Sequence, residues 1–323
     1  MLNRRKLLRT MAAASLLLAP ASWTAAYGSD TYPSRVVTFV VAYPPGGGAD
    51  ILARVLAKRL TEVWAQPVVV MNKSGAFGTI AANAVGSSTP DGHTLLVGAS
   101  GMFALDNTKT LAKTLAPTSL LSAPPVIIAV NASLPVSSLG ELVAYAKARP
   151  EKVTFASSGA GSSTHLAGEL FMGLTQTRLT HIPYKGMGQA IQDLVGGTVT
   201  LMFGPPPVLL PHIKSGRLKS LAVASRQRSP LFPDIPTAAE AGVSGFEAGL
   251  WFGVFAPAKT PREIVTKVSA DTARALRSPE IEQTLASGGS TPIGSSPEEF
   301  AQFLEADTAL WGNVLRKAGV TPQ

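Results

Sequence analysis

A short apolar strand followed by a glycine-rich loop and an amphipathic helix is the pattern that most constrains this chain, because it occurs twice. The first copy runs from an apolar stretch at 36–41 through a loop at 43–50 to apolar residues at helical spacing from position 51. The second copy has a strand at 153–155, a loop at 157–164 and a helix at 165–174. Strands that alternate with helices are typical of α/β layers around largely parallel sheets. We therefore expect two α/β lobes, each with loops at the carboxyl ends of its strands.

The length of 323 residues agrees with two domains, at roughly 100–200 residues each. Apolar stretches at 126–130 and 250–255 are placed to connect them. We therefore expect a discontinuous first lobe at 27–125 and 250–323, a second lobe at 126–249, and a cleft between them, since open α/β sheets bind ligands at the carboxyl ends of their strands. The last helix is amphipathic and is expected to pack back on the first lobe.

Two segments have the spacing of helix capping boxes. Thr260 and Glu263 form one pair, and Ser296 and Glu299 form the other, each with a proline directly after the Thr or Ser. Both pairs predict a helix that begins just after the capping residue.

Residues 1–26 have the pattern of an export signal. Basic residues precede an apolar run at 11–19 and a small-residue site at 24–26, and the run is too short for a membrane anchor. The pair Arg4 and Arg5 resembles a twin-arginine signal, while the general secretory route remains open. With no cysteine there is no lipid-anchored terminal Cys. We expect cleavage near Tyr27 and a location in the periplasm.

The composition excludes several kinds of site. No cysteine is present, which excludes disulfides, thiol nucleophiles and thiolate metal sites. The four histidines are scattered and form no metal pair at helical spacing, so we expect no metal. Without the four basic residues of the signal, 24 basic residues face 20 acidic ones and form no dense stripe. A nucleic-acid partner is therefore not expected.

The glycine loop at 46–48 does not match the known cofactor motifs. Ile51 stands where the dinucleotide fingerprint needs its last glycine, and the chain has no phosphate loop ending in Gly-Lys-Ser or Gly-Lys-Thr. The nucleophile elbow and the zinc-protease motif are also absent from the sequence. We expect no cofactor, and we do not expect an enzyme.

Both glycine loops come directly before helices, whose first backbone N–H groups lack partners and suit an anion such as a carboxylate. The loop at 46–48 has a plain tight turn as its alternative interpretation. For the loop at 157–164, the alternative is that Ser162 and Ser163 only cap the following helix.

Three side chains near these loops each have two interpretations. His165 either donates to a ligand or packs in the interior. Lys185 either attracts an anionic ligand or is solvated, as most lysines are. Asp193 either accepts a hydrogen bond from a ligand or water, or is a surface carboxylate.

Several motifs occur in a specific order along the chain: Tyr43-Pro44-Pro45-Gly46-Gly47 with Asp50, Pro90-Asp91-Gly92-His93-Thr94, Gly159-Ala160-Gly161-Ser162 with His165, Pro183-Tyr184-Lys185-Gly186 with Asp193, and Pro233-Asp234-Ile235-Pro236-Thr237. Each motif alone is weak. Together they resemble the Bug-type (TctC-like) extracytoplasmic solute receptors of tripartite tricarboxylate transporters, over nearly the whole mature chain.

The resemblance implies an α/β, two-lobed periplasmic binding protein of the type II, Venus-flytrap kind, with two crossing strands, that closes over a small carboxylate without catalysis. It implies membrane transporter subunits as partners, no direct membrane insertion and no cofactor, and we expect a monomer. The residues expected to bind the ligand are Tyr43, Pro44, Gly46, Gly47, Gly48, Asp50, Phe77, Gly78, Thr79, Ser100, Ser157, Gly159, Gly161, Ser162, Thr164, His165, Tyr184, Lys185, Asp193 and Phe203.

The sequence departs from the family pattern beside the expected cleft. Phe77 stands where glycine is common, and Met187 begins a segment, 187–190, that replaces the usual Gly-Ala-Pro-Ala. The segment 106–120 is also shortened. The bulk of Phe77 and Met187 suggests a ligand with an apolar or aromatic tail. A sensing role, in which the closed form is presented to a sensor kinase, remains the alternative to delivery to a transporter.

Overall fold

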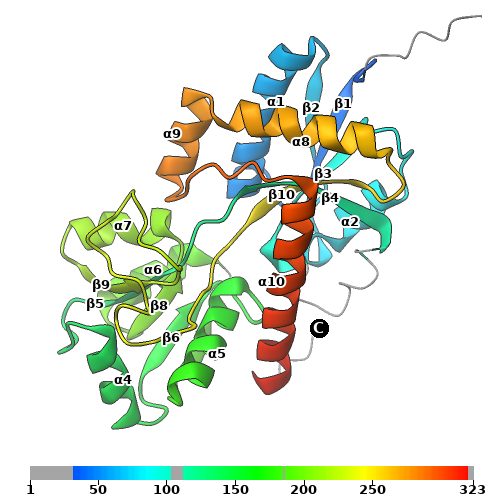
Figure 1. The fold of residues 1–323 in the computed structure, drawn as a ribbon. Helices are drawn as coiled ribbons and strands as arrows, with labels where there is room; N and C mark the ends of the chain where they lie inside the picture. The colour runs from blue at the N-terminus through cyan, green and yellow to red at the C-terminus, as the bar shows by residue number, and fades with distance from the viewer. Residues whose placement is uncertain (1–31, 103–110, 112, 185, 319–323) are drawn as a thin grey trace, which may run out of the picture.

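The computed structural model describes residues 32–102, 111, 113–184 and 186–318. It contains two five-stranded sheets (Figure 1). The first sheet has the order β2 (Val68–Asn72), β1 (Val37–Val41), β3 (Thr94–Ala99), β10 (Phe252–Pro257) and β4 (Leu115–Ser122). The second has the order β7 (Thr180–Pro183), β6 (Thr154–Ser157), β8 (Leu201–Gly204), β5 (Ile127–Asn131) and β9 (Leu218–Val223). The prediction of two α/β lobes is confirmed.

Each sheet has a parallel part that carries the loops of interest. In the first sheet β1 pairs in parallel with β2 and β3, whereas β10 is antiparallel to β3 and β4. In the second sheet β6 pairs in parallel with β7 and β8, whereas β5 is antiparallel to β8 and β9. The loops after β1 and β6 therefore lie at the carboxyl edge of parallel strands, where α/β proteins place their ligands.

Helices cover both faces of each sheet. In the first lobe, α1 (Gly48–Trp64), α8 (Arg262–Leu276) and α9 (Pro279–Ser287) pack on one face, and α2 (Thr79–Gly86) packs on the other. In the second lobe, α4 (Leu139–Lys147) and α5 (Ser163–Thr175) share one core, and α6 (Met187–Gly196) and α7 (Pro206–Lys214) the other. Two short 3-10 helices, η1 (Ala76–Gly78) and η2 (Ser100–Met102), follow β2 and β3. Alternate strand residues point to opposite cores, as the two-residue period of a strand requires.

The chain passes between the sheets twice, and the two passages lie side by side. Pro125 and Gly249 form an antiparallel bridge. The backbone N–H of Leu250 donates to Pro124 O at 2.9 Å, and that of Val126 donates to Ala248 O at 3.0 Å. The two connections are therefore hydrogen-bonded to each other. They lie just before β5 and β10, whereas the stretches predicted to connect the lobes, 126–130 and 250–255, mostly form those two strands inside the sheets.

The last helix, α10 (Pro297–Ala318), packs on both lobes (Figure 1). Phe300 and Leu304 belong to the first-lobe core, whereas Trp311 and Val314 belong to the second-lobe core that contains α5. The prediction that this helix packs on the first lobe is therefore correct but incomplete, because the helix also packs on the second lobe. Its apolar face is long enough for both cores, and the sequence pattern does not show where one partner ends and the next begins.

The two capping boxes have different outcomes. The one before α10 is confirmed, because the N–H of Glu299 donates to Ser296 Oγ at 3.2 Å and the N–H of Ser296 donates to Glu299 Oε2 at 2.9 Å. The one at Thr260 is wrong. Pro261, with φ −52° and ψ 137°, itself occupies the cap position of α8, so that Thr260 lies one residue too early to cap the helix.

Strand β4 was not expected from the sequence. It contains Pro117, which cannot donate to a ladder and usually argues against a strand. Because β4 lies at the edge of its sheet, the missing donor is tolerated there.

Within the described residues, no helix combines the length and the apolar character needed to cross a membrane.

Candidate ligand-binding site

The first-lobe glycine loop is ordered by the buried carboxylate of Asp50, in the first turn of α1. Its Oδ2 accepts from the N–H of Gly46 at 2.9 Å and from Arg54 Nε at 2.9 Å, and its Oδ1 accepts from Asn72 Nδ2 at 2.8 Å. Asn72 also donates to Tyr43 O at 3.0 Å. Hydrogen bonding to Arg54 lowers the pKa of Asp50 to about 2, although burial opposes the shift. The carboxylate of Asp50 therefore stays ionised and holds the loop against α1 and the end of β2.

The start of α1 itself is exposed and has no side-chain cap. Residues 44–48 are exposed, and no side chain accepts from the first turn after Gly47. Gly46 has φ +81°, in the left-handed region that favours glycine. A Cβ on Gly48 would lie 3.2 Å from the Phe252 ring, so glycine also permits close packing there. No side chain caps the first N–H groups of this 17-residue helix, and Asp50, the acidic residue of its first turn, is bonded to Gly46, Arg54 and Asn72.

Tyr43 and Ser100 lie on the same side of the first lobe. The hydroxyl of Tyr43 donates to Ala99 O at 3.4 Å, and burial raises its pKa. Ser100 directly follows β3, and its buried Oγ has no hydrogen-bond partner among the described residues. Ser122 Oγ, at the end of β4, is in the same situation, although no sequence motif marks it. Both serines lie next to the start of β10, because the N–H of Ser100 donates to Trp251 O and Ser122 pairs with Phe252.

The loop after β2 places Gly78 and Thr79 at the start of α2. Gly78 has φ +92°, and a Cβ there would lie 2.7 Å from the Met102 side chain, so only glycine fits. Thr79 Oγ1 donates to Ala76 O at 2.8 Å. Lys185 and the side chain of Phe77 lie outside the part of the chain that the structure describes.

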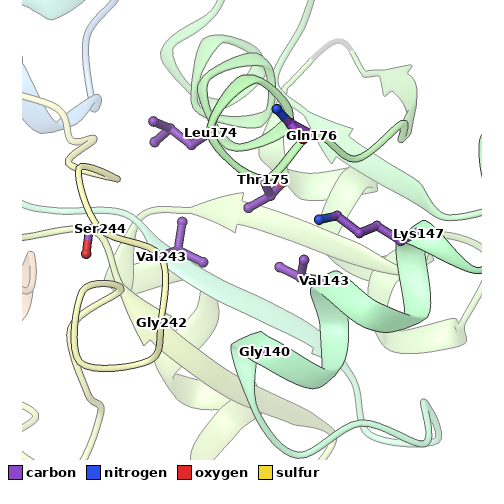
Figure 2. Close-up of a pocket in the computed structure, with 9 residues that line it drawn as sticks. All are labelled: Gly140, Val143, Lys147, Leu174, Thr175, Gln176, Gly242, Val243 and Ser244. Atoms are coloured by element: carbon purple, nitrogen blue, oxygen red, sulfur yellow. The ribbon is translucent and has the colours of Figure 1, made fainter.

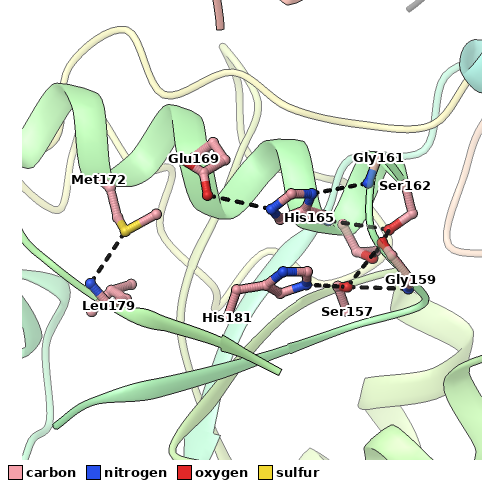
Figure 3. A network of polar contacts seen from close by, with 10 residues as sticks. Ser157, Gly159, Gly161, Ser162, His165, Glu169, Met172, Leu179 and His181 are labelled. Atoms are coloured by element: carbon pink, nitrogen blue, oxygen red, sulfur yellow. Dashed lines mark hydrogen bonds and ion pairs between the residues drawn. The ribbon is translucent and has the colours of Figure 1, made fainter. Parts of the chain in front are cut away.

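The hydroxyl groups of the second-lobe loop are directed into the loop itself (Figure 3). Ser162 is the N-cap of α5: its Oγ accepts from the N–H of His165 at 3.3 Å and donates to Gly159 O at 2.7 Å. Thr164 Oγ1 accepts from the N–H of Ser158 at 3.0 Å. The capping interpretation is confirmed for Ser162. The side chains therefore shape the loop, and its backbone is the part that remains for a ligand.

Two histidines lie stacked beneath this loop (Figure 3). The ring centroids of His165 and His181 are 3.8 Å apart with 10° between the planes. His165 Nδ1 accepts from the N–H of Gly161 at 3.0 Å, and Nε2 lies 3.3 Å from Glu169 Oε1. These two histidines, scattered in the sequence, are thus brought together by the fold. His181 was not selected from the sequence, because only the parallel pairing of β6 with β7 brings it below the loop.

The environment of His181 is largely apolar. Its Nε2 lies 2.6 Å from Ser157 Oγ, and its ring stacks on Phe155 at 4.9 Å. Burial, and to a smaller extent the neighbouring His165, lower the pKa of His181 to about 4, and Glu169 opposes the shift. Among the described residues the ring nitrogens of His165 are both engaged within the protein, which favours the packing interpretation of that side chain.

Tyr184 and Asp193 form a pair in the second lobe. The Tyr184 hydroxyl donates to Asp193 Oδ2 at 2.6 Å, and the N–H of Tyr184 donates to Ser157 O at 3.1 Å. Burial, together with Asp193, raises the pKa of Tyr184 to about 12. Asp193 therefore orders the segment before α6, which begins after Gly186 without a side-chain cap. The structure brings these two predicted site residues together with Ser157.

Phe203 is a correction to the predicted site. Its side chain is fully buried in the second-lobe core, at 5.8 Å from Phe155, 5.3 Å from Phe171 and 5.8 Å from Phe246 between ring centroids. The ring lies at the end of β8 but points into the aromatic core, so it contributes to packing.

Within the described residues there is no group of three or more His, Asp or Glu side chains that could hold a metal ion.

Two cavities lie elsewhere in the second lobe. One, of about 320 Å³, lies between α4, the end of α5 and the loop at 242–244, and is lined by residues that include Val143, Lys147 and Leu174 (Figure 2). The other, of about 400 Å³, lies between α5 and α10 and includes Glu169 and Leu310. Neither contains a residue predicted to bind the ligand.

Two α/β sheets joined by two paired connections, with glycine loops at the carboxyl edges of their parallel strands, define the two-lobed fold of periplasmic binding proteins. The chain belongs to the tripartite tricarboxylate transporter family receptors (TctC), whose family model matches residues 52–320. The resemblance seen in the motifs is thereby confirmed.

Individual relatives agree with this assignment. Protein BugT of Bordetella pertussis is 37% identical over 318 residues, which cover 96% of this chain and 98% of BugT. A structure of an R. palustris protein with adipate has a TM-score of 0.76 and 37% identity, covering 90% of this chain and 100% of that one. MatC from Rhodopseudomonas palustris with bound malate has a TM-score of 0.72 and 33% identity, covering 88% of this chain and 100% of MatC.

Proposed function

We propose that this protein captures a small carboxylate between its lobes in the periplasm and delivers it to a tripartite tricarboxylate-type membrane transporter. The observation that carries the proposal is the exposed, uncapped start of α1. The nearest carboxylate, Asp50, already accepts hydrogen bonds from Gly46, Arg54 and Asn72 and leaves the first N–H groups of the helix without an anion. A ligand carboxylate complements these groups and the positive end of the helix dipole.

The second lobe supports the proposal with a similar arrangement. The loop after β6 is shaped by its own hydroxyl groups, and α6 begins without a side-chain cap at Gly186. Two lobes that each present backbone N–H groups hold a carboxylate through fixed dipoles and need no arginine for it. The adipate and malate bound by the two relatives have the chemistry that such a site requires.

The same proposal includes the parts of the ligand and of the chain that lie away from the carboxylate. Phe77 and Met187 stand where the family has small residues, so we expect a ligand with an apolar or aromatic tail.

Residues 1–26 act as an export signal and are cleaved. The lobes are 27–125 with 250–323, and 126–249, in agreement with the hydrogen-bonded passages at Pro124 and Leu250. The protein acts as a monomer and turns over no substrate.

The deciding experiment is mass spectrometry of ligand released from protein purified from its native periplasm, followed by a thermal-shift screen of mono- and dicarboxylates that includes adipate and malate. We expect a released carboxylate and a rise in unfolding temperature with the same compound, because a ligand that binds only the folded state stabilises it. Chemical conversion of the bound compound, or no stabilisation by any carboxylate, contradicts the proposal.

A matched pair of glycine variants tests the α1 loop. In Gly47→Val the new Cβ meets Pro44 O at 3.5 Å, an ordinary contact, and the φ of −77° suits any residue, so the fold is expected to persist. Gly140→Val places the same side chain in open space at the start of α4. Only the first variant is expected to weaken carboxylate binding.

Capture of transporter membrane subunits by the liganded protein supports delivery, whereas capture of a sensor kinase supports the sensing alternative.

A further inference from the structure

The second-lobe loop depends on an imidazole nitrogen that carries no proton. The N–H of Gly161 donates to His165 Nδ1 at 3.0 Å, so Nδ1 acts as the acceptor and must present its lone pair. In the neutral ring the proton is therefore on Nε2, which faces Glu169 Oε1 at 3.3 Å. A proton added at Nδ1 removes this acceptor of the Gly161 N–H and turns an attraction into a repulsion between two donors.

His181 contacts the start of the same loop through Ser157. Ser157 Oγ lies 2.6 Å from His181 Nε2 and accepts from the N–H of Gly159 at 3.1 Å. The serine thus joins the second imidazole to the loop backbone, as His165 does two residues further on. Because the two rings lie face to face at 3.8 Å, a charge on one opposes a charge on the other.

The surroundings offer little compensation for a charged pair. Glu169 on α5 is the one carboxylate that acts on both rings among the described residues, and it lies at the edge of His165. Strand β6 contributes the apolar ring of Phe155, stacked on His181 at 4.9 Å, and the hydroxyl of Ser157. Burial lowers the pKa of His181 to about 4, in agreement with this geometry. The stack is thus built for neutral imidazoles.

We infer that His165 and His181 are positioning residues of the ligand site: as neutral imidazoles they hold the backbone of 157–162 in its binding geometry, and acid protonation of the stack releases the loop and weakens carboxylate binding. This inference rests on the proposed function for the identity of the ligand. It adds a proton-sensitive element to the site, and it assigns a role to His181, which makes no predicted ligand contact.

The first test needs no ligand. In nuclear magnetic resonance of the ligand-free protein, the His165 ring is expected to be the Nε2–H tautomer, and the Gly161 amide signal is expected to shift when acid protonates the stack. His165→Asn places an acceptor near the position of Nδ1 that does not titrate, so the Gly161 amide should become insensitive to pH. A Gly161 amide that ignores the histidine titration in the wild type overturns the inference.

The matched control is His212→Asn. His212 is in the same lobe, at the end of α7, where burial and Arg217 also lower its pKa, and its backbone O accepts from Ser215 Oγ rather than from the loop at 157–162. This variant is expected to keep the wild-type titration of Gly161. Loss of that titration in His212→Asn shows a general effect of histidine charge in the lobe and overturns the specific role of the stack.

The second test measures adipate affinity by calorimetry at pH 7.5 and at pH 4, near the pKa of His181. Adipate itself takes up protons, so the decisive quantity is the difference between variants. We expect the wild type to lose about tenfold more affinity than His165→Asn over this range, the size of one hydrogen-bonded contact. His212→Asn should follow the wild type. Equal losses in the wild type and His165→Asn overturn the inference. If adipate does not bind at either pH, the proposed ligand class is at fault and the Gly161 titration alone decides the positioning role.

Discussion

Asp307 on α10 accepts hydrogen bonds from Trp251, at the start of β10, and from Trp311, one turn further along the same helix, and its removal should cost more than any surface change. Its Oδ2 accepts from Trp251 Nε1 at 3.0 Å, and its Oδ1 accepts from Trp311 Nε1 at 2.9 Å. Trp251 lies in the first-lobe core at the start of β10, and Trp311 lies in the second-lobe core. A single carboxylate therefore connects the passage between the lobes to the helix that spans them.

The expected magnitude follows from these two bonds. A hydrogen bond to a charged group contributes about 1.5–3 kcal/mol, so two contribute about 3–6 kcal/mol. Burial raises the pKa of Asp307, which shows that the ionised carboxylate is poorly solvated, and its removal recovers part of that cost. We expect Asp307→Ala to lower the free energy of unfolding by about 3 kcal/mol, or the melting temperature by about 6–12 °C.

Asp307→Asn separates charge from hydrogen bonding. The amide keeps one acceptor oxygen, so the expected loss at neutral pH is smaller, about 1.5 kcal/mol. Because the folded pKa of Asp307 lies above its unfolded value, its contribution to stability is present at low pH and is lost as pH rises through the folded pKa. The stability gap between the wild type and Asp307→Asn should therefore narrow as pH rises from about 4.

Urea unfolding followed by far-ultraviolet circular dichroism measures these differences without relying on the tryptophans involved. Glu305→Ala is the matched control, because it removes an exposed carboxylate from the same helix and should change stability by less than about 0.5 kcal/mol. A wild-type free energy of unfolding in Asp307→Ala would refute the account, since it would mean that water replaces the carboxylate at no cost.

Four further predictions concern binding, stability and processing. Gly47→Val should weaken carboxylate binding more than tenfold, about 1.4 kcal/mol, by calorimetry, and an unchanged affinity removes that loop from the site. Affinity should depend weakly on salt, and Lys185→Ala should cost less than Gly47→Val; a steep salt slope in the same titrations means that a point charge dominates. Gly253→Ala should destabilise the fold by about 1–3 kcal/mol in urea, since its Cβ would lie 2.2 Å from the Phe300 ring, and wild-type stability would contradict this packing. Intact-mass analysis of periplasmic protein should show a chain that begins near Tyr27, and retention of residues 1–26 contradicts the export signal.

Local patterns account for what the sequence analysis predicted correctly. The strand, glycine loop and helix at each lobe, and the capping box at Ser296 and Glu299, depend on residues only a few positions apart. The family motifs are also local. Two local predictions were wrong or missing. Pro261 occupies the cap position that Thr260 was expected to hold, and the edge strand β4 was not predicted because it contains Pro117.

The shape of the site depended on contacts between distant residues. Asp50 was selected as a ligand contact, but Asn72 and Arg54 make it the residue that orders the loop. Phe203 ends a strand beside the predicted site, yet packing turns its ring into the core. In both cases the residue type and its position along the chain were compatible with two roles, and only its neighbours in space decided between them.

The sequence by itself determined the two α/β lobes, the position of the glycine loops and the family, because periodicity, capping and turn chemistry act over a few residues. The stack of His165 on His181 and the span of α10 across both cores were decided only by the tertiary structure. The stack requires β6 and β7 to pair in one register, and the span requires two lobes at a given distance. A local pattern shows neither which distant segments pair in a sheet nor how far apart two lobes lie, so the groups that hold the ligand loop became visible only in the folded protein.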